Sequence, residues 1–213
     1  MLTEVKRRRD TNQLARYSPY ARQREFHNSA NRERLLMAGN QLGKTFCGAA
    51  EAAIHATGLY PDWWEGRRFS KPTRGWAGSK TSEVTRDGVQ RYLVGDPKTE
   101  SLWGQGMVPK AKLLSTKRRQ GVADALDNIT VRHASGGISS IGFKSYDQGR
   151  QKWQSETLDY VWFDEEPPMD IYMEGLTRTN ATKGIAFITF TPLLGMSDVV
   201  SMFLTDEAVD DSG

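Results

Sequence analysis

The chain has 213 residues, of which 38% are hydrophobic and 26% are charged. This balance is typical of a globular domain with enough apolar material for a core, and the lack of any run of about 18 apolar residues predicts no membrane partner. The single cysteine, Cys47, excludes an internal disulfide bond and predicts a cytoplasmic protein. No apolar run follows the charged start of the chain, so the sequence predicts no signal peptide.

The charged residues are unevenly distributed, although the formal net charge is only +3. Basic residues gather at 6–9 and again at 110–119, and the last eight residues are acidic. Basic clusters suit a polyanion such as DNA, and the alternative is an ordinary solvated surface. We predict a basic N-terminal arm over 1–16, one folded domain over 17–204 and an acidic, linker-like end over 205–213.

Short apolar runs alternate with helical patterns along this domain. In chain order the patterns predict a helix over 17–30, a strand over 34–38, a helix over 46–57, a strand over 75–78, a helix over 82–94, a strand over 112–115, a hairpin of strands 129–131 and 138–143, and strands over 158–163 and 184–190. Strands alternating with helices predict an α/β fold, with a largely parallel central sheet flanked by helices. Ligands of such sheets bind at the carboxyl ends of the strands.

A near match to the phosphate-loop pattern G-x-x-x-x-G-K-[ST] lies between a predicted strand and a predicted helix. Ala38 stands at the first glycine position, and Gly39 follows it. Backbone N–H groups of such a loop wrap a phosphate, Lys44 would reach the β and γ phosphates, and Thr45 would hold Mg²⁺. A chance match is the alternative. The predicted nucleotide-binding residues here are Gly39, Asn40, Gln41, Leu42, Gly43, Lys44, Thr45 and Phe46.

A second motif lies where the strand over 158–163 ends in Asp164, Glu165 and Glu166. Asp164 is the candidate Mg²⁺ ligand, and Glu165 is the candidate base that orients and deprotonates the attacking water. Glu166 is a second candidate base, and an acidic turn without a catalytic role is the remaining alternative. Adjacent strand residues point to opposite faces, so Asp164 and Glu165 need a turn between them to share one site.

The last predicted strand ends in Thr189, Phe190, Thr191 and Pro192. A hydroxyl at this position could contact the γ phosphate. Spacing alone favours the simpler interpretation, a strand that is capped by threonine and proline.

Together these motifs resemble the ATPase domain of tailed-phage large terminases. The resemblance covers 17 to about 204 and is carried by Asp147–Arg150 before Trp153, Phe163–Pro168, Glu174–Asn180 and Thr189–Leu193. It implies a P-loop NTPase fold of the RecA/ASCE type, with ATP and Mg²⁺ as cofactors. It also implies ATP hydrolysis that drives double-stranded DNA into a procapsid.

The resemblance further implies particular residues and partners. Gln23, with Tyr17 nearby, matches an adenine-contacting glutamine, although an exposed helix residue is an equal alternative. Thr189–Thr191 matches a threonine-rich coupling motif, with Thr191 as a candidate catalytic residue. The implied partners are the portal protein, the small terminase subunit and further copies of the chain, which form a ring on the capsid vertex. The isolated domain could instead be a monomer. The implied location is the host bacterial cytoplasm.

The chain departs from the family pattern in two places. Asn40 and Gln41 stand where many terminases carry an arginine in the phosphate loop. Arg150 and Arg178 are therefore candidates for stabilising the γ phosphate, within the chain or in a neighbouring subunit, and an ordinary salt bridge is the alternative for each. Family members usually continue into a nuclease domain, so we expect ATPase activity and no nuclease activity from this fragment.

Two other functions compete with a packaging ATPase. One is a nucleotide-dependent DNA-binding module that does not hydrolyse ATP, against which the intact motifs argue. The other is a two-lobed helicase, which needs a second lobe for which 213 residues leave no room.

Overall fold

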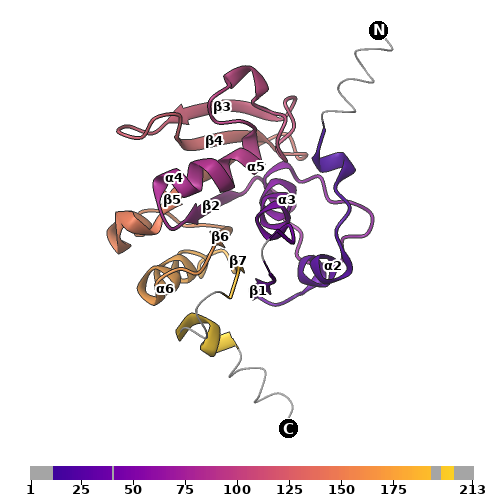
Figure 1. The fold of residues 1–213 in the computed structure, drawn as a ribbon. Helices are drawn as coiled ribbons and strands as arrows, with labels where there is room; N and C mark the ends of the chain where they lie inside the picture. Colours follow the sequence, from indigo (N-terminus) through magenta and orange to yellow (C-terminus); the bar gives the residue numbers. More distant parts are fainter. Residues whose placement is uncertain (1–11, 40, 193–197, 204–213) are drawn as a thin grey trace.

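In the computed structural model of the chain, residues 12–39, 41–192 and 198–203 are described (Figure 1). Within these residues seven strands form one sheet. The strands are β1 (Glu33–Met37), β2 (Arg74–Ser79), β3 (Leu113–Arg118), β4 (Leu126–Arg132), β5 (Ile138–Ser145), β6 (Tyr160–Asp164) and β7 (Ile185–Phe190).

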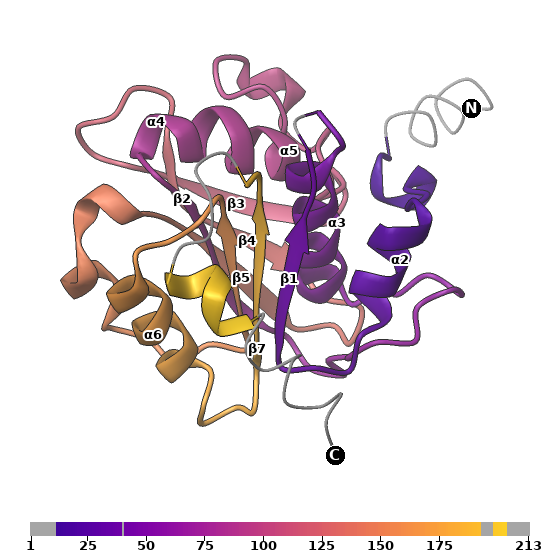
Figure 2. The same ribbon diagram turned by 60° about the horizontal axis from the view of Figure 1, so that its bottom comes forward.

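The strand order is β1-β7-β6-β2-β5-β4-β3. The neighbours from β1 to β5 are all parallel, and β5, β4 and β3 pair antiparallel. This arrangement confirms the predicted α/β fold with a largely parallel sheet. Strand β7 lies between β1 and β6, and the arrowheads of β1 and β7 point to the same edge in Figure 2. The three predicted motifs therefore meet at one edge of the sheet.

The helices match most of the predicted segments. The longer helices are α2 (Ala21–Asn28), α3 (Lys44–Thr57) and α6 (Met169–Arg178), and short 3-10 turns are η1 (Leu14–Arg16), η3 (Glu100–Leu102), η4 (Tyr146–Gln148) and η5 (Arg150–Trp153). The predicted helix over 82–94 is one continuous helical segment made of α4 (Ser82–Val84), a π-helical stretch η2 (Thr85–Gln90) and α5 (Arg91–Val94). The π-helical stretch was not predicted.

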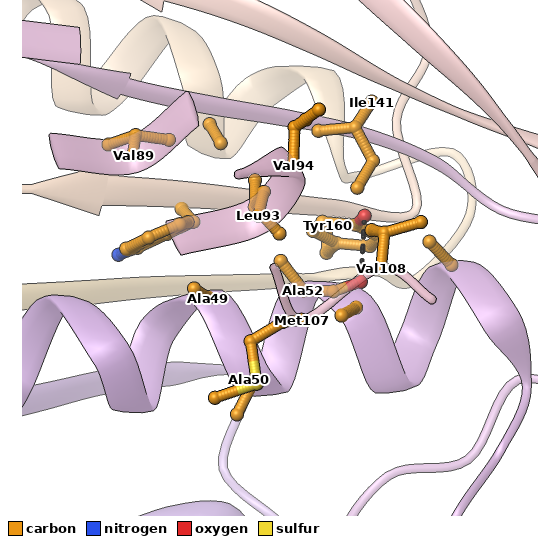
Figure 3. Close-up of a cluster of buried hydrophobic side chains, with 14 of the residues drawn as sticks. Ala49, Ala50, Ala52, Val89, Leu93, Val94, Met107, Val108, Ile141 and Tyr160 are labelled. Atoms are coloured by element: carbon orange, nitrogen blue, oxygen red, sulfur yellow. Dashed lines mark hydrogen bonds between the residues drawn. The ribbon is translucent and has the colours of Figure 1, made fainter. Parts of the chain in front are cut away.

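Two hydrophobic layers cover the two faces of the sheet. Helices α3 and α5 pack on one face, and α6 and the helical residues 198–203 pack on the other (Figures 1 and 2). Figure 3 shows small side chains of α3, such as Ala49 and Ala52, below Leu93 and Val94 of α5. The Tyr160 hydroxyl donates a hydrogen bond of 3.2 Å to the Ala52 carbonyl, which fixes α3 against β6.

Helix α3 lies unusually close to the sheet where it carries Gly48. A Cβ added to Gly48 would lie 2.3 Å from the Trp162 ring, so only glycine permits this approach. The helix ends as predicted at Gly58, which adopts the left-handed conformation with φ of 68°. Close packing of α3 on β6 holds the start of the helix near the end of that strand.

Several predicted bounds were wrong by a few residues. Helix α3 begins at Lys44 rather than at 46, β6 runs to Asp164 rather than over 158–163, and β4 is longer than 129–131. The helix predicted over 17–30 is shorter, because Tyr17 and Tyr20 are extended and α2 starts at Ala21. Most of the predicted arm and the acidic end lie outside the described residues. None of the helices in the described part of the chain is long and apolar enough to cross a membrane.

Candidate functional site

The predicted phosphate loop connects β1 to α3 at the carboxyl edge of the sheet. Gln41 and Gly43 both have positive φ, 61° and 73°, so the loop turns sharply before the helix begins at Lys44. No side chain of the described residues caps the first turn of α3 and no acidic residue lies in that turn, which leaves its N–H groups to an anion. Asn40 lies outside the described residues.

Lys44 is held inside the loop. The residue is 7% exposed, and its Nζ donates a hydrogen bond of 2.7 Å to the Gly39 carbonyl. The side chain thus already folds back over the loop, in the direction of the space that the loop surrounds. This geometry suits a cation that exchanges a carbonyl oxygen for phosphate oxygens.

Asp164 is the last residue of β6 and is only 4% exposed. The Thr189 hydroxyl donates a hydrogen bond of 2.9 Å to Asp164 Oδ1 and accepts one of 2.8 Å from Trp162 Nε1. Burial raises the pKa of Asp164 to about 7, against the opposing effects of the Thr189 and Thr45 hydroxyls and of Lys44. No Lys, Arg or His of the described residues forms an ion pair with this carboxylate, so its charge lacks a fixed counterion.

Glu165 supplies the turn that the sequence requires between the two acidic residues. Its φ is 63°, in the left-handed region that a non-glycine residue seldom occupies. The Glu165 N–H donates to the Thr189 carbonyl at 2.7 Å, and the Thr191 N–H lies 3.5 Å from Glu165 Oε2. The backbone therefore turns directly after Asp164, held by Thr189 of β7 and by Thr191 just beyond that strand. Glu166 is half-buried, and burial raises the pKa of its carboxyl group.

The residues around Asp164 fit a Mg²⁺ ion. Carboxylate and hydroxyl oxygens are the ligands that Mg²⁺ prefers, and one or two carboxylates with substrate phosphates are sufficient. Gly88, in the π-helical stretch, leaves room beside them because it has no side chain. A Cβ added to Gly88 would lie 3.8 Å from Asp164 Oδ2 and 4.0 Å from Thr45 Cγ2. Groups of three or more His, Cys, Asp or Glu that could hold a metal by themselves do not occur in the described ranges.

Gln23 lies against the phosphate loop. It is 6% exposed, its Nε2 lies 3.4 Å from the carbonyl oxygens of Leu42 and Gly43, and its Oε1 accepts the Tyr20 N–H. The alternative of an exposed helix residue is therefore wrong, because α2 packs its inner face on the loop.

Tyr17 and Phe46 lie in the same region. Their rings pack edge to face with centroids 5.7 Å apart, and Phe46 makes a similar contact with Tyr92 at 5.8 Å. The Tyr17 hydroxyl is hydrogen-bonded to His27 Nε2 at 2.8 Å. The rings of Tyr17, Phe46 and Tyr92 thus form a row of aromatic contacts next to the start of α3, and adenine contact by Gln23 and Tyr17 stays a prediction.

Residues 35–211 match the family described as terminase large subunit, T4likevirus-type, N-terminal. The chain belongs to this family. It is 44% identical over 223 residues to the large terminase subunit of Salmonella phage P22, a match that covers 96% of this chain and 45% of the relative. The match to the large subunit of Enterobacteria phage LP7 is 24% identical and covers 96% and 46%. This terminase chain therefore spans about half the length of these relatives.

Solved structures support the fold of this terminase chain. The large terminase ATPase domain of Thermus phage P74-26 has a TM-score of 0.60 at 19% identity, covering 90% of this chain and 72% of that one. The large terminase of another thermophilic bacteriophage has a TM-score of 0.54 at 11% identity, covering 81% and 39%. The sheet and its helices are those of a P-loop ATPase fold, as the sequence predicted.

The two candidate arginines of this terminase chain both pair with Glu174 on α6. Arg150 Nε lies 2.8 Å from Glu174 Oε2, and Arg178 Nη2 lies 2.7 Å from Oε1. Arg178 also donates to the Gln154 carbonyl at 3.0 Å. Both side chains thus form salt bridges within the chain, and none of their interactions among the described residues reaches the phosphate loop; their catalytic roles stay predictions.

Sequence reasoning missed several residues of the site. The Tyr146 hydroxyl lies 3.1 Å and 2.9 Å from the carbonyl oxygens of Asp164 and Glu165, so it braces the turn, yet no motif marks it. Thr189 was within the recognised threonine motif, but the contact of its hydroxyl with Asp164 follows only from the strand order. Gly88 carries no signal in the sequence, since its role depends on packing between helix and strand.

Proposed function

We propose that this terminase chain hydrolyses ATP with Mg²⁺ and that hydrolysis powers the movement of double-stranded DNA into a viral procapsid. The observation that supports this most directly is the convergence of Lys44, Thr45, Asp164 and Glu165 at one edge of the sheet, with a left-handed turn at Glu165. A module that only binds nucleotide has no need of a carboxylate at this turn.

In this proposal the loop N–H groups and the first turn of α3 bind the β and γ phosphates. Lys44 leaves the Gly39 carbonyl and pairs with phosphate oxygens. Mg²⁺, when held by Thr45 and Asp164, neutralises charge on the phosphates and orients them. Adenine would lie near Gln23, Tyr17 and Phe46.

Glu165 then accepts a proton from the attacking water. The water oxygen bonds to the γ phosphorus as the bond between that phosphorus and the bridging oxygen breaks, and ADP leaves with the electron pair. Thr189 and the Thr191 N–H connect the acidic turn to β7, so loss of the γ phosphate could be transmitted to that strand. This is the coupling role that we assign to Thr189–Thr191.

The test compares Glu165→Ala with Glu166→Ala, its matched neighbour. Glu165→Ala should abolish phosphate release while leaving Mg²⁺-ATP binding largely intact, because the base acts in the transition state. Glu166→Ala should be milder, and Lys44→Ala should remove most nucleotide affinity. A wild-type chain that binds Mg²⁺-ATP without phosphate release would instead indicate a non-hydrolysing module. Greater damage from Glu166→Ala would assign the base to Glu166.

We propose that Arg150 rather than Arg178 completes the site of a neighbouring subunit. The Arg150 side chain is 57% exposed, against 28% for Arg178, and Arg178 has a second hydrogen bond to Gln154. An arginine that reaches a γ phosphate contributes about 10³–10⁵ in rate. Such a contribution requires a ring of subunits. We propose that this ring assembles at the capsid vertex in the host cytoplasm, where it contacts the portal protein and the small terminase subunit.

Mixing two variants tests this assignment. A Lys44→Ala subunit retains Arg150 but cannot hold ATP, and an Arg150→Ala subunit holds ATP but lacks the arginine. Turnover restored in the mixture, and not in either variant alone, means that Arg150 acts between subunits. Activity that stays strictly linear with protein concentration, without rescue in the mixture, would contradict it.

A further inference from the structure

A row of polar side chains crosses the sheet next to the candidate Mg²⁺ site. Side chains along a strand alternate between the two faces, and Ala77, Phe143, Trp162 and Phe187 all belong to the hydrophobic layer on the α3 face. The residues two positions later therefore share that face, at the carboxyl ends of four neighbouring strands. They are Ser145, Ser79, Asp164 and Thr189.

All four side chains are buried, and three of them have partners. Thr189 donates to Asp164, and Ser145 shares a hydrogen bond of 3.0 Å with Ser82, whose hydroxyl also accepts from Arg119 at 3.0 Å. Ser79 is 0% exposed, and its Oγ has no partner among the described residues. A buried hydroxyl without a partner costs about 1–3 kcal/mol, so its persistence needs an explanation.

Ser79 is placed beside Asp164. Gly78 is the Cα partner of Phe163 in the parallel pair of β2 and β6, so the next residues, Ser79 and Asp164, are neighbours where both strands end. The Ser79 N–H is already bonded to Thr85 Oγ1 at 3.1 Å, which anchors its backbone to the start of the π-helical stretch. The same stretch carries Gly88, which leaves space beside Asp164 Oδ2.

We propose that Ser79 is a positioning residue whose hydroxyl accepts a hydrogen bond from a water molecule in the Mg²⁺ shell at Asp164. Mg²⁺ sheds its waters reluctantly and keeps several when few protein ligands are present. Such waters are polarised by the ion and donate strong hydrogen bonds, which suits an unpaired oxygen in a buried position. This inference rests on the proposed function and adds a specific group outside the recognised motifs.

The test measures Mg²⁺-dependent binding of a fluorescent, non-hydrolysable ATP analogue. Ser79→Ala should raise the half-saturating Mg²⁺ concentration about tenfold, the lower end of the range for groups that hold metal ligands in place. Binding of the analogue in EDTA should be unchanged. The Tm in EDTA should be unchanged or slightly higher, because an unpaired buried hydroxyl is removed. Ser145→Ala is the matched control, since this serine has the same burial and face but already has a partner, and its Mg²⁺ requirement should equal that of the wild type.

The outcomes separate this inference from the proposed function. An unchanged Mg²⁺ requirement in Ser79→Ala, or an equal rise in Ser145→Ala, would overturn the role of Ser79 while leaving the ATPase proposal intact. A wild-type chain without Mg²⁺-dependent binding would overturn both. Ser79→Cys, which keeps a weaker acceptor at similar size, should give an intermediate requirement and shows that any loss in Ser79→Ala does not come from misfolding.

Discussion

Two buried carboxylates of this terminase chain, Glu51 and Asp164, have opposite electrostatic surroundings. Burial opposes ionisation of Glu51, but Arg34 and the hydrogen bonds of His27 and His55 outweigh it and hold the pKa of Glu51 well below its ordinary value. Burial of Asp164 is opposed mainly by hydroxyl groups, and its pKa is raised to about 7. Within the described ranges, cations thus pair with Glu51, whereas no cation pairs with Asp164.

The difference follows from what each carboxylate connects. Glu51 on α3 contacts Arg34 of β1, lies 2.6 Å from His27 Nδ1 of α2, and lies 3.3 Å from His55 Nε2 one turn along its own helix. Glu51 therefore joins α2 to α3, the helix that starts at the phosphate loop. Because Gln23 lies on α2, this connection also holds Gln23 against the loop. Asp164 has space beside it instead. We infer that Glu51 is a structural anchor, and that Asp164 is kept ready for a cation from solution.

The first prediction concerns the anchor role of Glu51. Glu51→Gln keeps the size of the side chain but leaves the Arg34 guanidinium buried without its counterion. We expect the free energy of unfolding to fall by about 3–5 kcal/mol, measured by urea denaturation.

Glu25→Gln is the control for this prediction, because Glu25 pairs with Arg22 on the exposed side of α2. It should change stability by less than about 0.5 kcal/mol. A loss below about 1 kcal/mol for Glu51→Gln would mean that the buried pair of Arg34 and Glu51 is not what anchors α3 to β1.

The second prediction has the opposite sign and concerns Asp164. Its pKa of about 7 lies above the 3.8 of an ordinary aspartate, so between these values the unfolded chain binds fewer protons than the folded one. The contribution of Asp164 to the stability of the metal-free chain should therefore fall as pH rises from about 4 to 7 and then level off. Asp164→Asn removes this dependence and should stabilise the metal-free chain at pH 8 by on the order of 2 kcal/mol.

The same substitution should abolish Mg²⁺-dependent binding of the ATP analogue, so stability and function move in opposite directions. Thermal unfolding in EDTA across pH 4–8 and an Mg²⁺ titration provide the two measurements. If Asp164→Asn lowered the Tm of the metal-free chain at every pH, the carboxylate would be a structural group like Glu51.

Local patterns in the sequence were sufficient to predict the strands, the phosphate loop and the acidic strand end. The turn at Glu165 could also be deduced, because adjacent strand residues point to opposite faces and Asp164 and Glu165 had to share one site. These inferences work because each depends on residues that are neighbours in the chain. The roles of Arg150, Arg178 and Thr191 remain predictions.

Contacts between distant segments could not be predicted in this way. The bond from Thr189 to Asp164 exists because β7 lies between β1 and β6, and strand order is not encoded in the spacing of motifs. The Glu51 anchor combines residues of α2, β1 and α3 that look like ordinary helix and strand positions. The π-helical stretch that brings Gly88 to the site likewise carries no recognisable local signal.

The third prediction, with the smallest expected effect, concerns the space beside Asp164. Gly88 lies in a helical segment, where alanine is favoured over glycine by about 0.5–1 kcal/mol. The added Cβ would lie 3.8 Å from Asp164 Oδ2, an ordinary van der Waals contact, so the metal-free fold should accept it. Gly88→Ala should therefore raise the Tm measured in EDTA by a few degrees.

The same methyl group should weaken Mg²⁺ binding, because it occupies part of the volume that the waters of the ion would need. We expect the half-saturating Mg²⁺ concentration to rise severalfold in Gly88→Ala and further in Gly88→Val, whose side chain extends deeper into this space. The graded pair distinguishes a steric effect from a general change in the helix, since β-branching lowers helix propensity and should reverse the gain in Tm. If both variants bound Mg²⁺ and the ATP analogue like the wild type, the space beside Asp164 would not be the metal site, and its raised pKa would reflect burial alone.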